Sequence, residues 1–243
     1  MRIAIAQIKP VTGNIEANIV RHLQFVDQAI DQRADAIFFP ELSLTSYEPT
    51  LAGELAMDLN DQRLGVFQQR SDHNNIIIAA GGPLKAEGGT QIGMFIFQPG
   101  MLRQVYAKQF LHSDELPYFI NGNKQVLIHA DNNQCIAPGI CYETSLPEHW
   151  ENAHQRGAGI YVASVAKSAN GVERSVKIFP AMAVKYNMTV LLSNSLGPSD
   201  NFTGAGQSAA WDNKGQLVAQ LDDTREGILI YDTVNRSTSE IIL

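Results

Sequence analysis

The chain has 243 residues, and its 44% hydrophobic and 18% charged residues are typical of a globular protein. Its net charge is −7 and it has no run of Lys or Arg, which argues against a nucleic-acid partner because phosphate binding needs a basic surface. It has no apolar run long enough to cross a bilayer, so we expect no membrane partner.

The N-terminal segment, MRIAIAQIKPVTGN, does not resemble a signal peptide, because its apolar stretch is short and Gln7 and Lys9 interrupt it. The sequence therefore predicts a cytoplasmic protein. Cysteine usage agrees, since the only two cysteines, Cys135 and Cys141, fall in one predicted strand. Six strand residues span roughly 20 Å, whereas a disulfide needs Cα atoms within about 7 Å of each other. Neither cysteine has metal-ligand spacing, and we expect no metal and no cofactor.

The first part of the chain alternates strand-like and helix-like patterns. Residues 2–8 alternate isoleucines with small residues, which predicts a strand. Asn14 is a suitable N-cap for the helix that follows. Apolar residues at spacings of three and four define one face of this helix: Ile15, Ile19, Leu23, Val26 and Ile30. Residues 36–39 predict a short apolar strand, residues 61–72 a weaker helix, and residues 76–80 a buried strand.

Two hairpins are predicted in the middle of the chain. Residues 93–98 and 102–107 flank a Pro-Gly turn signal. Residues 125–130 and 133–141 flank an Asp-Asn pair in the same way. Hairpins require antiparallel pairing, so a purely parallel sheet is excluded.

The last part of the chain predicts further alternation. Residues 145–156 predict a helix with a capping box, Ser145-x-x-Glu148, and with Pro147 in its first turn. The other elements are strand 160–164, helix 172–186, strand 190–194 and the strands 208–211, 216–221 and 227–231. This alternation, combined with hairpins, favours a layered α/β architecture with mixed sheets. No repeat or linker marks a boundary, so we expect a single domain over residues 1–243.

Three reactive side chains each follow the end of a short apolar strand, where ligand sites of α/β sheets usually lie. Glu41 follows the first of these strands. Partial burial there would raise the pKa of its carboxyl and make it a usable base, although surface and helix-capping glutamates share the pattern. Lys108 follows the second. It would supply a fixed positive charge for a developing oxyanion, although a lysine after a strand is usually a surface residue.

Cys141 lies where a predicted strand meets a predicted helix. This position would expose the sulfur at a tight turn, as in a nucleophile elbow, and the helix N-terminus would lower the pKa of the thiol. The alternative is a buried structural cysteine, the role that we expect for Cys135. The sequence has no glycine-rich phosphate loop. His112 is the only histidine near a candidate residue, and a Cys–His pair stays open beside Glu41 as the base.

In this order, the three segments resemble the nitrilase, or carbon–nitrogen hydrolase, superfamily. The segment Phe38-Phe-Pro-Glu-Leu-Ser-Leu-Thr-Ser-Tyr47 is very close to the family pattern around its glutamate, and Ile3-Ala-Ile-Ala-Gln7 is similar to the family's first strand. Glu115, Asn194 and Phe202-Thr-Gly204…Ser208 resemble its later signatures. The resemblance covers essentially the whole chain.

The resemblance implies a four-layer α-β-β-α sandwich, assembled as a homodimer through its helical layer. It also implies a catalytic triad of Glu41, Lys108 and Cys141. Glu115 would support Lys108 or orient the substrate, and the backbone N–H of Tyr142 would help to hold the oxyanion.

Three further side chains are expected at a pocket for a small-molecule substrate. Tyr47 and Tyr118 would make this pocket partly apolar. Lys167 could meet a substrate carboxylate, although solvent exposure is the preferred interpretation of this lysine.

The predicted reaction is the thiol-dependent hydrolysis of a small amide or carbamoyl-amine, through a thioester on the cysteine. Nitrile hydrolysis is one alternative. A glutaminase unit that supplies ammonia to a separate partner enzyme is another. The third alternative is a binding module whose site has become catalytically silent.

Overall fold

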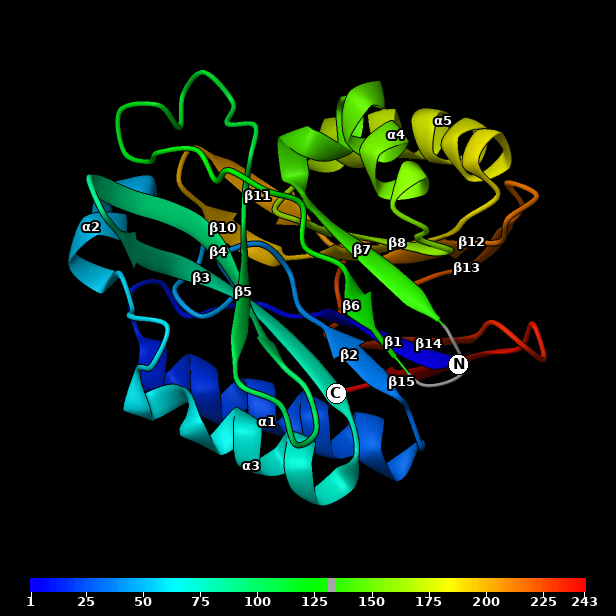
Figure 1. Ribbon diagram of the computed structural model, residues 1–243, viewed down its shortest axis with the longest axis horizontal. Coiled ribbons are helices and arrows are strands. Elements are labelled where there is room, and N and C mark those ends of the chain that lie inside the picture. The colour runs from blue at the N-terminus through cyan, green and yellow to red at the C-terminus, as the bar shows by residue number, and fades with distance from the viewer. Residues whose placement is uncertain (131–133) are drawn as a thin grey trace.

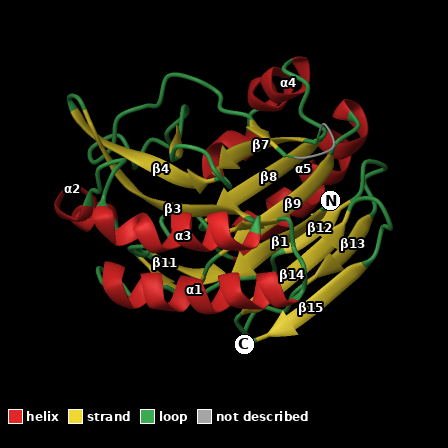
Figure 2. Ribbon diagram, turned by 60° about the horizontal axis from the view of Figure 1, so that its bottom comes forward, coloured by secondary structure: helices red, strands yellow, loops and turns green. Residues whose placement is uncertain are grey.

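Figure 1 shows the computed structural model, which describes residues 1–130 and 134–243. Two β-sheets pack face to face, and helices cover the outer face of each sheet (Figures 1 and 2). Both sheets are mixed, with parallel and antiparallel neighbours. The predicted four-layer α-β-β-α sandwich is therefore confirmed.

The first sheet consists of β1 (Arg2–Gln7), β2 (Ala36–Phe38), β3 (Ile77–Ala86), β4 (Gly89–Phe97), β5 (Gln104–Ala107), β14 (Gly227–Asp232) and β15 (Thr238–Ile242). Their order across the sheet is β15-β14-β1-β2-β3-β4-β5. The central strands β1, β2 and β3 run parallel, and the outer pairs run antiparallel. Two antiparallel steps separate β5 from β3, so β5 runs in the same direction as β2 and both strands end at the same edge of the sheet.

The second sheet consists of β6 (Ile128–His129), β7 (Cys135–Ile140), β8 (Ile160–Val165), β9 (Thr189–Asn194), β12 (Ala209–Trp211) and β13 (Leu217–Gln220). Their order is β13-β12-β9-β8-β7-β6, and β7, β8 and β9 run parallel. A separate antiparallel ribbon joins β10 (Leu196–Ser199) to β11 (Phe202–Ala205).

The helices form two outer layers. On the first sheet lie α1 (Ile15–Asp31) and α3 (Gly65–Asn74), and on the second lie α4 (Pro147–Gln155) and α5 (Ala169–Tyr186), while the short α2 (Ala52–Leu55) sits near β3 (Figures 1 and 2). Three 3₁₀ turns complete the set: η1 (Pro49–Leu51), η2 (Gln62–Leu64) and η3 (Cys141–Ser145). None of the helices in the described ranges has the length and apolar character needed to span a membrane.

Helix α1 begins as its sequence predicts. The Asn14 side chain accepts a hydrogen bond from the backbone N–H of Ala17 at 3.0 Å, which satisfies one of the free donors at the helix N-terminus. The predicted apolar face, including Ile15, Ile19 and Val26, is buried against the first sheet. Burial of this face is the main source of stability for such a helix.

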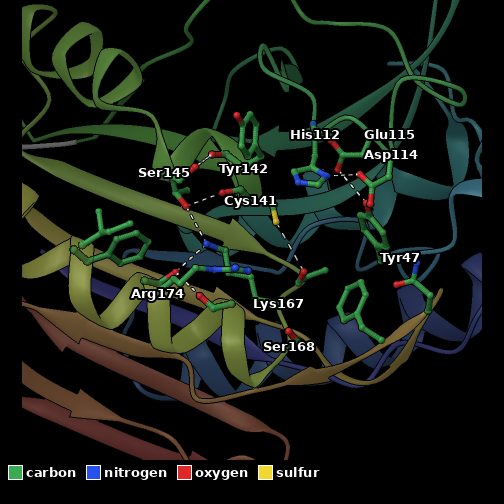
Figure 3. A pocket seen from close by; sticks show the side chains of 18 residues that line it. Tyr47, His112, Asp114, Glu115, Cys141, Tyr142, Ser145, Lys167, Ser168 and Arg174 are labelled. Atoms are coloured by element: carbon green, nitrogen blue, oxygen red, sulfur yellow. Dashed lines mark hydrogen bonds and ion pairs between the residues drawn. The ribbon is translucent and has the colours of Figure 1, made fainter.

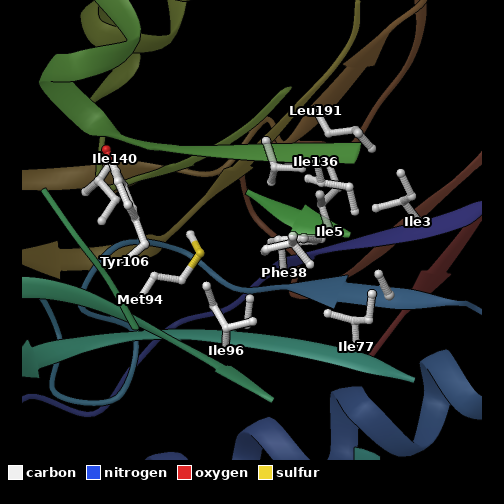
Figure 4. Packing of buried hydrophobic residues seen from close by; sticks show 14 of the residues in the cluster. Ile3, Ile5, Phe38, Ile77, Met94, Ile96, Tyr106, Ile136, Ile140 and Leu191 are labelled. Atoms are coloured by element: carbon white, nitrogen blue, oxygen red, sulfur yellow. The ribbon is translucent and has the colours of Figure 1, made fainter. Parts of the chain in front are cut away.

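The core between the sheets is built from branched and aromatic side chains of both inner faces. Ile5 and Phe38 from the first sheet meet Ile136 and Leu191 from the second, and all four are fully buried (Figure 4). Each such side chain contributes roughly 1.5–3 kcal/mol through burial. This layer fixes the two sheets relative to each other.

Two serine hydroxyls also join the sheets, close to the ends of β2, β8 and β9. Ser164 Oγ donates to the carbonyl of Phe39 at 2.8 Å, and Ser193 Oγ donates to the carbonyl of Ala6 at 2.6 Å. These bonds link backbone carbonyls of the first sheet to side chains of the second. They hold the strand ends of the two sheets in register.

Several elements differ from the sequence-based expectation. The strand predicted at 76–80 continues to Ala86 and forms a hairpin with β4 around Gly88, because the glycine adopts a positive φ of 85°. The ribbon β10–β11 and the edge strand β15 were not predicted. The second predicted hairpin is confirmed by the antiparallel pairing of β6 and β7; its turn, at 131–132, lies outside the described residues.

The predicted capping box at Ser145 is wrong. Ser145 ends η3, its hydroxyl donates to the carbonyl of Tyr142 at 2.7 Å, and the N-cap of α4 is Leu146. The physical reason is Pro147, which disfavours helical backbone in the residue before it. Leu146 is accordingly extended, with φ −98° and ψ 114°, so a helix cannot run through from Ser145.

A fully buried histidine on α1 predicts how stability depends on pH. His22 Nδ1 lies 2.7 Å from the carbonyl of Asn18 and Nε2 lies 2.9 Å from Ser43 Oγ. Burial lowers the pKa of His22 from 6.5 to about 4, so the unfolded chain binds more protons between these pH values. The free energy of unfolding should therefore fall as pH falls through this window, by roughly 3 kcal/mol from His22.

Denaturant unfolding of the wild type and of His22→Gln, at pH values from 7.5 to 4, measures this contribution. His22→Gln should be less stable at pH 7.5 but should lose less stability on acidification. The matched control is His73→Gln on the exposed surface of α3. Equal slopes for the wild type and His22→Gln would contradict the prediction.

Candidate active site

Two loops that follow strand ends bring a lysine and two carboxylates together. Glu41 follows β2, Lys108 follows β5, and Glu115 lies in the loop after Lys108. Lys108 Nζ lies 2.8 Å from Glu41 Oε1 and 2.6 Å from Glu115 Oε1. All three side chains are almost fully buried. These residues, predicted separately from the sequence, form one ion cluster.

Glu41 is placed by a tight turn that packs against β3. A Cβ atom at Gly81 would lie 2.4 Å from the carbonyl oxygen of Pro40 and 2.6 Å from the nitrogen of Leu42, so only glycine permits this approach. The backbone N–H of Leu44 donates to the carbonyl of Gly81 at 2.9 Å. Strand β3 thereby fixes the backbone on both sides of the carboxylate.

The two oxygens of Glu41 have different environments. Oε1 accepts from Lys108, whereas Oε2 is buried and has no hydrogen-bond partner among the described residues. Burial raises the pKa of Glu41 and Glu115 adds to this effect, while Lys108 and the thiol of Cys141 oppose it. A buried carboxylate with a free oxygen beside a thiol is suited to take the thiol proton.

Lys108 carries a fixed positive charge. Burial opposes the charged form, but Glu41, Cys141 and Glu115 raise the pKa of Lys108 above its ordinary value. Glu115 is itself held, because it accepts from the hydroxyl of Tyr47 at 3.1 Å and from the backbone N–H of His112 at 2.7 Å. Glu115 therefore supports Lys108, as the family resemblance implies.

Cys141 occupies a strained turn directly after β7. Its φ of 45° lies in the left-handed region, where residues other than glycine are uncommon. Behind it, Gly139 leaves room for the ring of Tyr161, whose hydroxyl oxygen would lie 2.1 Å from a Cβ at that position. This geometry matches the predicted nucleophile elbow.

The thiol of Cys141 is not acidic, which corrects the expectation of a lowered pKa. Burial raises the pKa of Cys141 to about 12, and Glu41 adds to the shift, while Lys108 and Lys167 oppose it. The expected helix dipole is missing because η3 has only five residues and α4 begins separately at Pro147. A neutral thiol must lose its proton to a nearby base as it attacks. Glu41 is placed to act as this general base.

Glu143 braces the nucleophile turn, a role that the sequence did not reveal. Its carboxylate accepts from the backbone N–H of Ile140 at 2.7 Å, from the hydroxyl of Tyr106 at 2.7 Å and from the backbone N–H of Gln109. Burial raises the pKa of Glu143 to about 7, while these donors favour its charged form. The bonds connect the loop after Lys108 to the turn that carries Cys141.

A cavity of about 520 Å³ opens beside the Cys141 sulfur (Figure 3). Tyr47 lines it, as expected, and so does Tyr142. Lys167 also lines it, and its predicted solvent exposure is wrong because the residue is half-buried in the cavity wall. Tyr118 is 44% exposed and is absent from the described lining residues. The sequence did not identify Arg174 and Phe202 as lining residues. Of the two, only Phe202 could have been found, because it belongs to a segment that resembles the family.

The alternative base, His112, also lines the cavity. Its Nδ1 lies 2.6 Å from Asp114 Oδ1, and its ring packs edge-on against Tyr142 at 5.3 Å between centroids. The hydrogen bond of the Cys141 thiol within the described ranges runs to the carbonyl of Ala166, at 3.9 Å. Glu41 is close enough to the thiol for a hydrogen bond from Cys141 to lower its pKa, whereas His112 makes no hydrogen bond with Cys141 in these ranges. Glu41 is therefore favoured over His112 as the base.

Comparison with solved structures supports the fold. An amidase from Nesterenkonia sp. AN1 superposes with a TM-score of 0.86 at 20% sequence identity, over 96% of this chain and 92% of that chain. The glutamine-dependent NAD⁺ synthetase of Acinetobacter baumannii superposes with a TM-score of 0.84 at 20% identity, over 99% of this chain but 47% of that chain.

Some sequence relatives are much longer than this chain, and another has about the same length. The glutamine-dependent NAD⁺ synthetase of Thermotoga maritima is 24% identical over 96% of this chain and 42% of its own length. That of Acinetobacter baylyi is 32% identical over 52% of this chain and 24% of its own length. The chain thus spans less than half of these synthetases. A protein described as a hydrolase in the agr operon of Staphylococcus aureus is 23% identical over 96% of this chain and 90% of its own length.

A family model, described as carbon–nitrogen hydrolase, also matches the chain. It covers residues 2–241 and includes Glu41, Lys108 and Cys141. With its two mixed sheets, its buried Glu–Lys–Glu cluster and its cysteine at a strained turn, the chain belongs to the carbon–nitrogen hydrolase family of the nitrilase superfamily.

Proposed function

We propose that this protein hydrolyses a small, non-peptide amide or carbamoyl-amine through a thioester on Cys141. The observation that carries the proposal is the free Oε2 of Glu41, buried next to a neutral thiol while Oε1 is held by Lys108. This arrangement pairs a nucleophile with a base, and the base with an orienting cation.

The reaction begins with proton transfer from Cys141 Sγ to Glu41 while the sulfur attacks the carbonyl carbon of the amide. Lys108 and the backbone N–H of Tyr142 stabilise the oxyanion, and one such donor typically contributes about 3 kcal/mol. The C–N bond then breaks, and Glu41 gives its proton to the departing amine. Water attacks the thioester with Glu41 as base, and the acid leaves as the thiol regains a proton.

Two relatives point to narrower activities. The Nesterenkonia protein is described as an amidase, and in a mutant of it the active-site cysteine carries the acetamide moiety of fluoroacetamide. Its description as an amidase favours a small amide as substrate here. The NAD⁺ synthetases use glutamine, so a glutaminase unit with a separate ammonia-consuming partner is the second candidate. Nitrile hydrolysis and a silent binding module are less favoured, the latter because the triad residues are all present.

The most informative experiment is a substrate panel. Small amides, carbamoyl-amines, glutamine and nitriles are incubated with the purified protein, and ammonia release is measured. Turnover of amides supports the proposal, whereas turnover confined to nitriles overturns it. Size-exclusion chromatography with light scattering would test the homodimer that the family resemblance implies.

The two cysteines should differ sharply in reactivity and in effect. Cys141→Ala should abolish hydrolysis, because the nucleophile is lost, whereas Cys135→Ala should retain it. In the wild type, iodoacetamide should label Cys141, which faces the cavity, ahead of Cys135, which is buried in β7. Peptide mass spectrometry measures the labelling, and ammonia release measures the activity. Equal activity of the two variants would contradict the assignment of Cys141 as the nucleophile.

The pH profile of kcat/KM follows from the state of the base. Glu41 must be ionised to accept the thiol proton, and its pKa is raised above 4.5, so activity should fall as pH falls through a midpoint above 4.5. Lys108 stays charged and Cys141 stays neutral through the alkaline range, so no alkaline loss is expected below pH 9.0. An acid midpoint near 4.5, or a loss of activity between pH 8 and 9, would count against these roles.

A further inference from the structure

A second lysine, Lys167, lies beside the nucleophile and forms no ion pair with the described residues. Lys167 Nζ lies 2.8 Å from Ser175 Oγ and 3.3 Å from Thr144 Oγ1, and 5.8 Å from the ring centroid of Phe179. These neighbours are neutral. Among the described residues no carboxylate forms an ion pair with it, in contrast to Lys108. A half-buried ammonium without a counter-ion is costly unless a ligand supplies one.

Arg174 adds a second positive charge to the same wall. It lies on α5 and lines the cavity with Lys167, and Figure 3 shows both side chains on the α5 side of the cavity, across from Tyr47 and Glu115. Arg174 is an exposed residue and forms no ion pair within the ranges that the structure describes. Burial is the main effect that lowers the pKa of Lys167, and the like charges of Arg174 and Lys108 add to it, while Cys141 and Glu41 oppose it. An anion between them would relieve this repulsion.

Lys167 is also held more firmly than a surface lysine. Asn194 binds its backbone from both sides, accepting from its N–H at 2.8 Å and donating to its carbonyl at 3.0 Å. The backbone N–H of Ala205 donates to the same carbonyl at 2.9 Å. The aliphatic stem packs over Gly171, where a Cβ would lie 3.0 Å from Lys167 Cβ. The fold thus fixes an uncompensated cation in the wall of the cavity.

We propose that Lys167 and Arg174 form a carboxylate-binding subsite, and that the acyl group of the substrate ends in a carboxylate opposite its amide. The substrate class would be a monoamide of a short dicarboxylic acid. Bidentate Arg and point-charge Lys are both suited to a carboxylate. Two oxygens can then pair with the two cations while the amide carbon faces Cys141. This inference rests on the proposed amide hydrolysis and specifies its substrate.

Matched substrate pairs test the subsite. Succinamate is compared with butyramide, and glutaramate with valeramide, since each pair differs chiefly in the terminal carboxylate. The wild type should prefer the anionic member. Lys167→Met and Arg174→Gln should each lower the ratio of kcat/KM for succinamate over butyramide by about ten- to a hundredfold, mainly through KM. Lys177→Met, an exposed lysine paired with Glu173 on α5, should leave the ratio unchanged.

Two kinetic outcomes would overturn the subsite. A ratio that stays the same in both variants would show that the cations do not select the carboxylate. An equal loss of kcat for both members of a pair would show that Lys167 acts on the oxyanion or on structure instead. Thermal unfolding of each variant, measured alongside, separates a loss of folding from a loss of recognition.

A binding measurement separates failure of the subsite from failure of the proposed reaction. Succinate should protect Cys141 of the wild type from iodoacetamide at concentrations where butyramide does not, and Lys167→Met should remove this protection. If no amide is hydrolysed but protection is seen, the hydrolase proposal fails and the subsite stands. If succinate gives no protection, the subsite is wrong whatever the protein hydrolyses.

Discussion

The arrangement of this site depends on one buried ammonium. Lys108 lies between Glu41 and Glu115 at hydrogen-bond distance from both, in a region closed to solvent. Removing one partner of such a cluster leaves an uncompensated buried charge, typically at a cost of roughly 3–5 kcal/mol. The loops after β2 and β5 must therefore end at fixed positions, and the tight packing at Gly81 meets that requirement for Glu41.

A carboxylate whose pKa is raised and a thiol whose pKa is about 12 are complementary parts of the same site. The thiol is neutral below its raised pKa, so it must give its proton to the ionised Glu41 carboxylate as the sulfur attacks. Lys108 orients the base, and the Glu143 brace holds the turn of Cys141 against the loop that follows Lys108. The strained backbone at Cys141 is supported by Glu143, which fixes the preceding residue, Ile140.

The two lysines near Cys141 differ in whether protein carboxylates balance their positive charge. Lys108 forms ion pairs with two carboxylates, whereas the described contacts of the Lys167 ammonium are two hydroxyls and an aromatic ring. Within the described ranges neither Lys167 nor the exposed Arg174 forms an ion pair, although the chain as a whole has a net charge of −7. Such an imbalance is expected where a ligand, rather than the protein, completes the charge balance.

The sequence by itself determined the fold class, most strands and helices, and the triad residues, because these depend on local periodicity and on motifs that are contiguous along the chain. Only the tertiary structure decided the burial of Lys167, the protonation of Cys141 and the start of α4 at Pro147. Glu143 shows the reason. It binds Gln109, which is 34 positions away, and no local pattern marks that contact. Burial and charge balance arise from segments that meet only in the folded chain, and they set the pKa values and the specificity of the site.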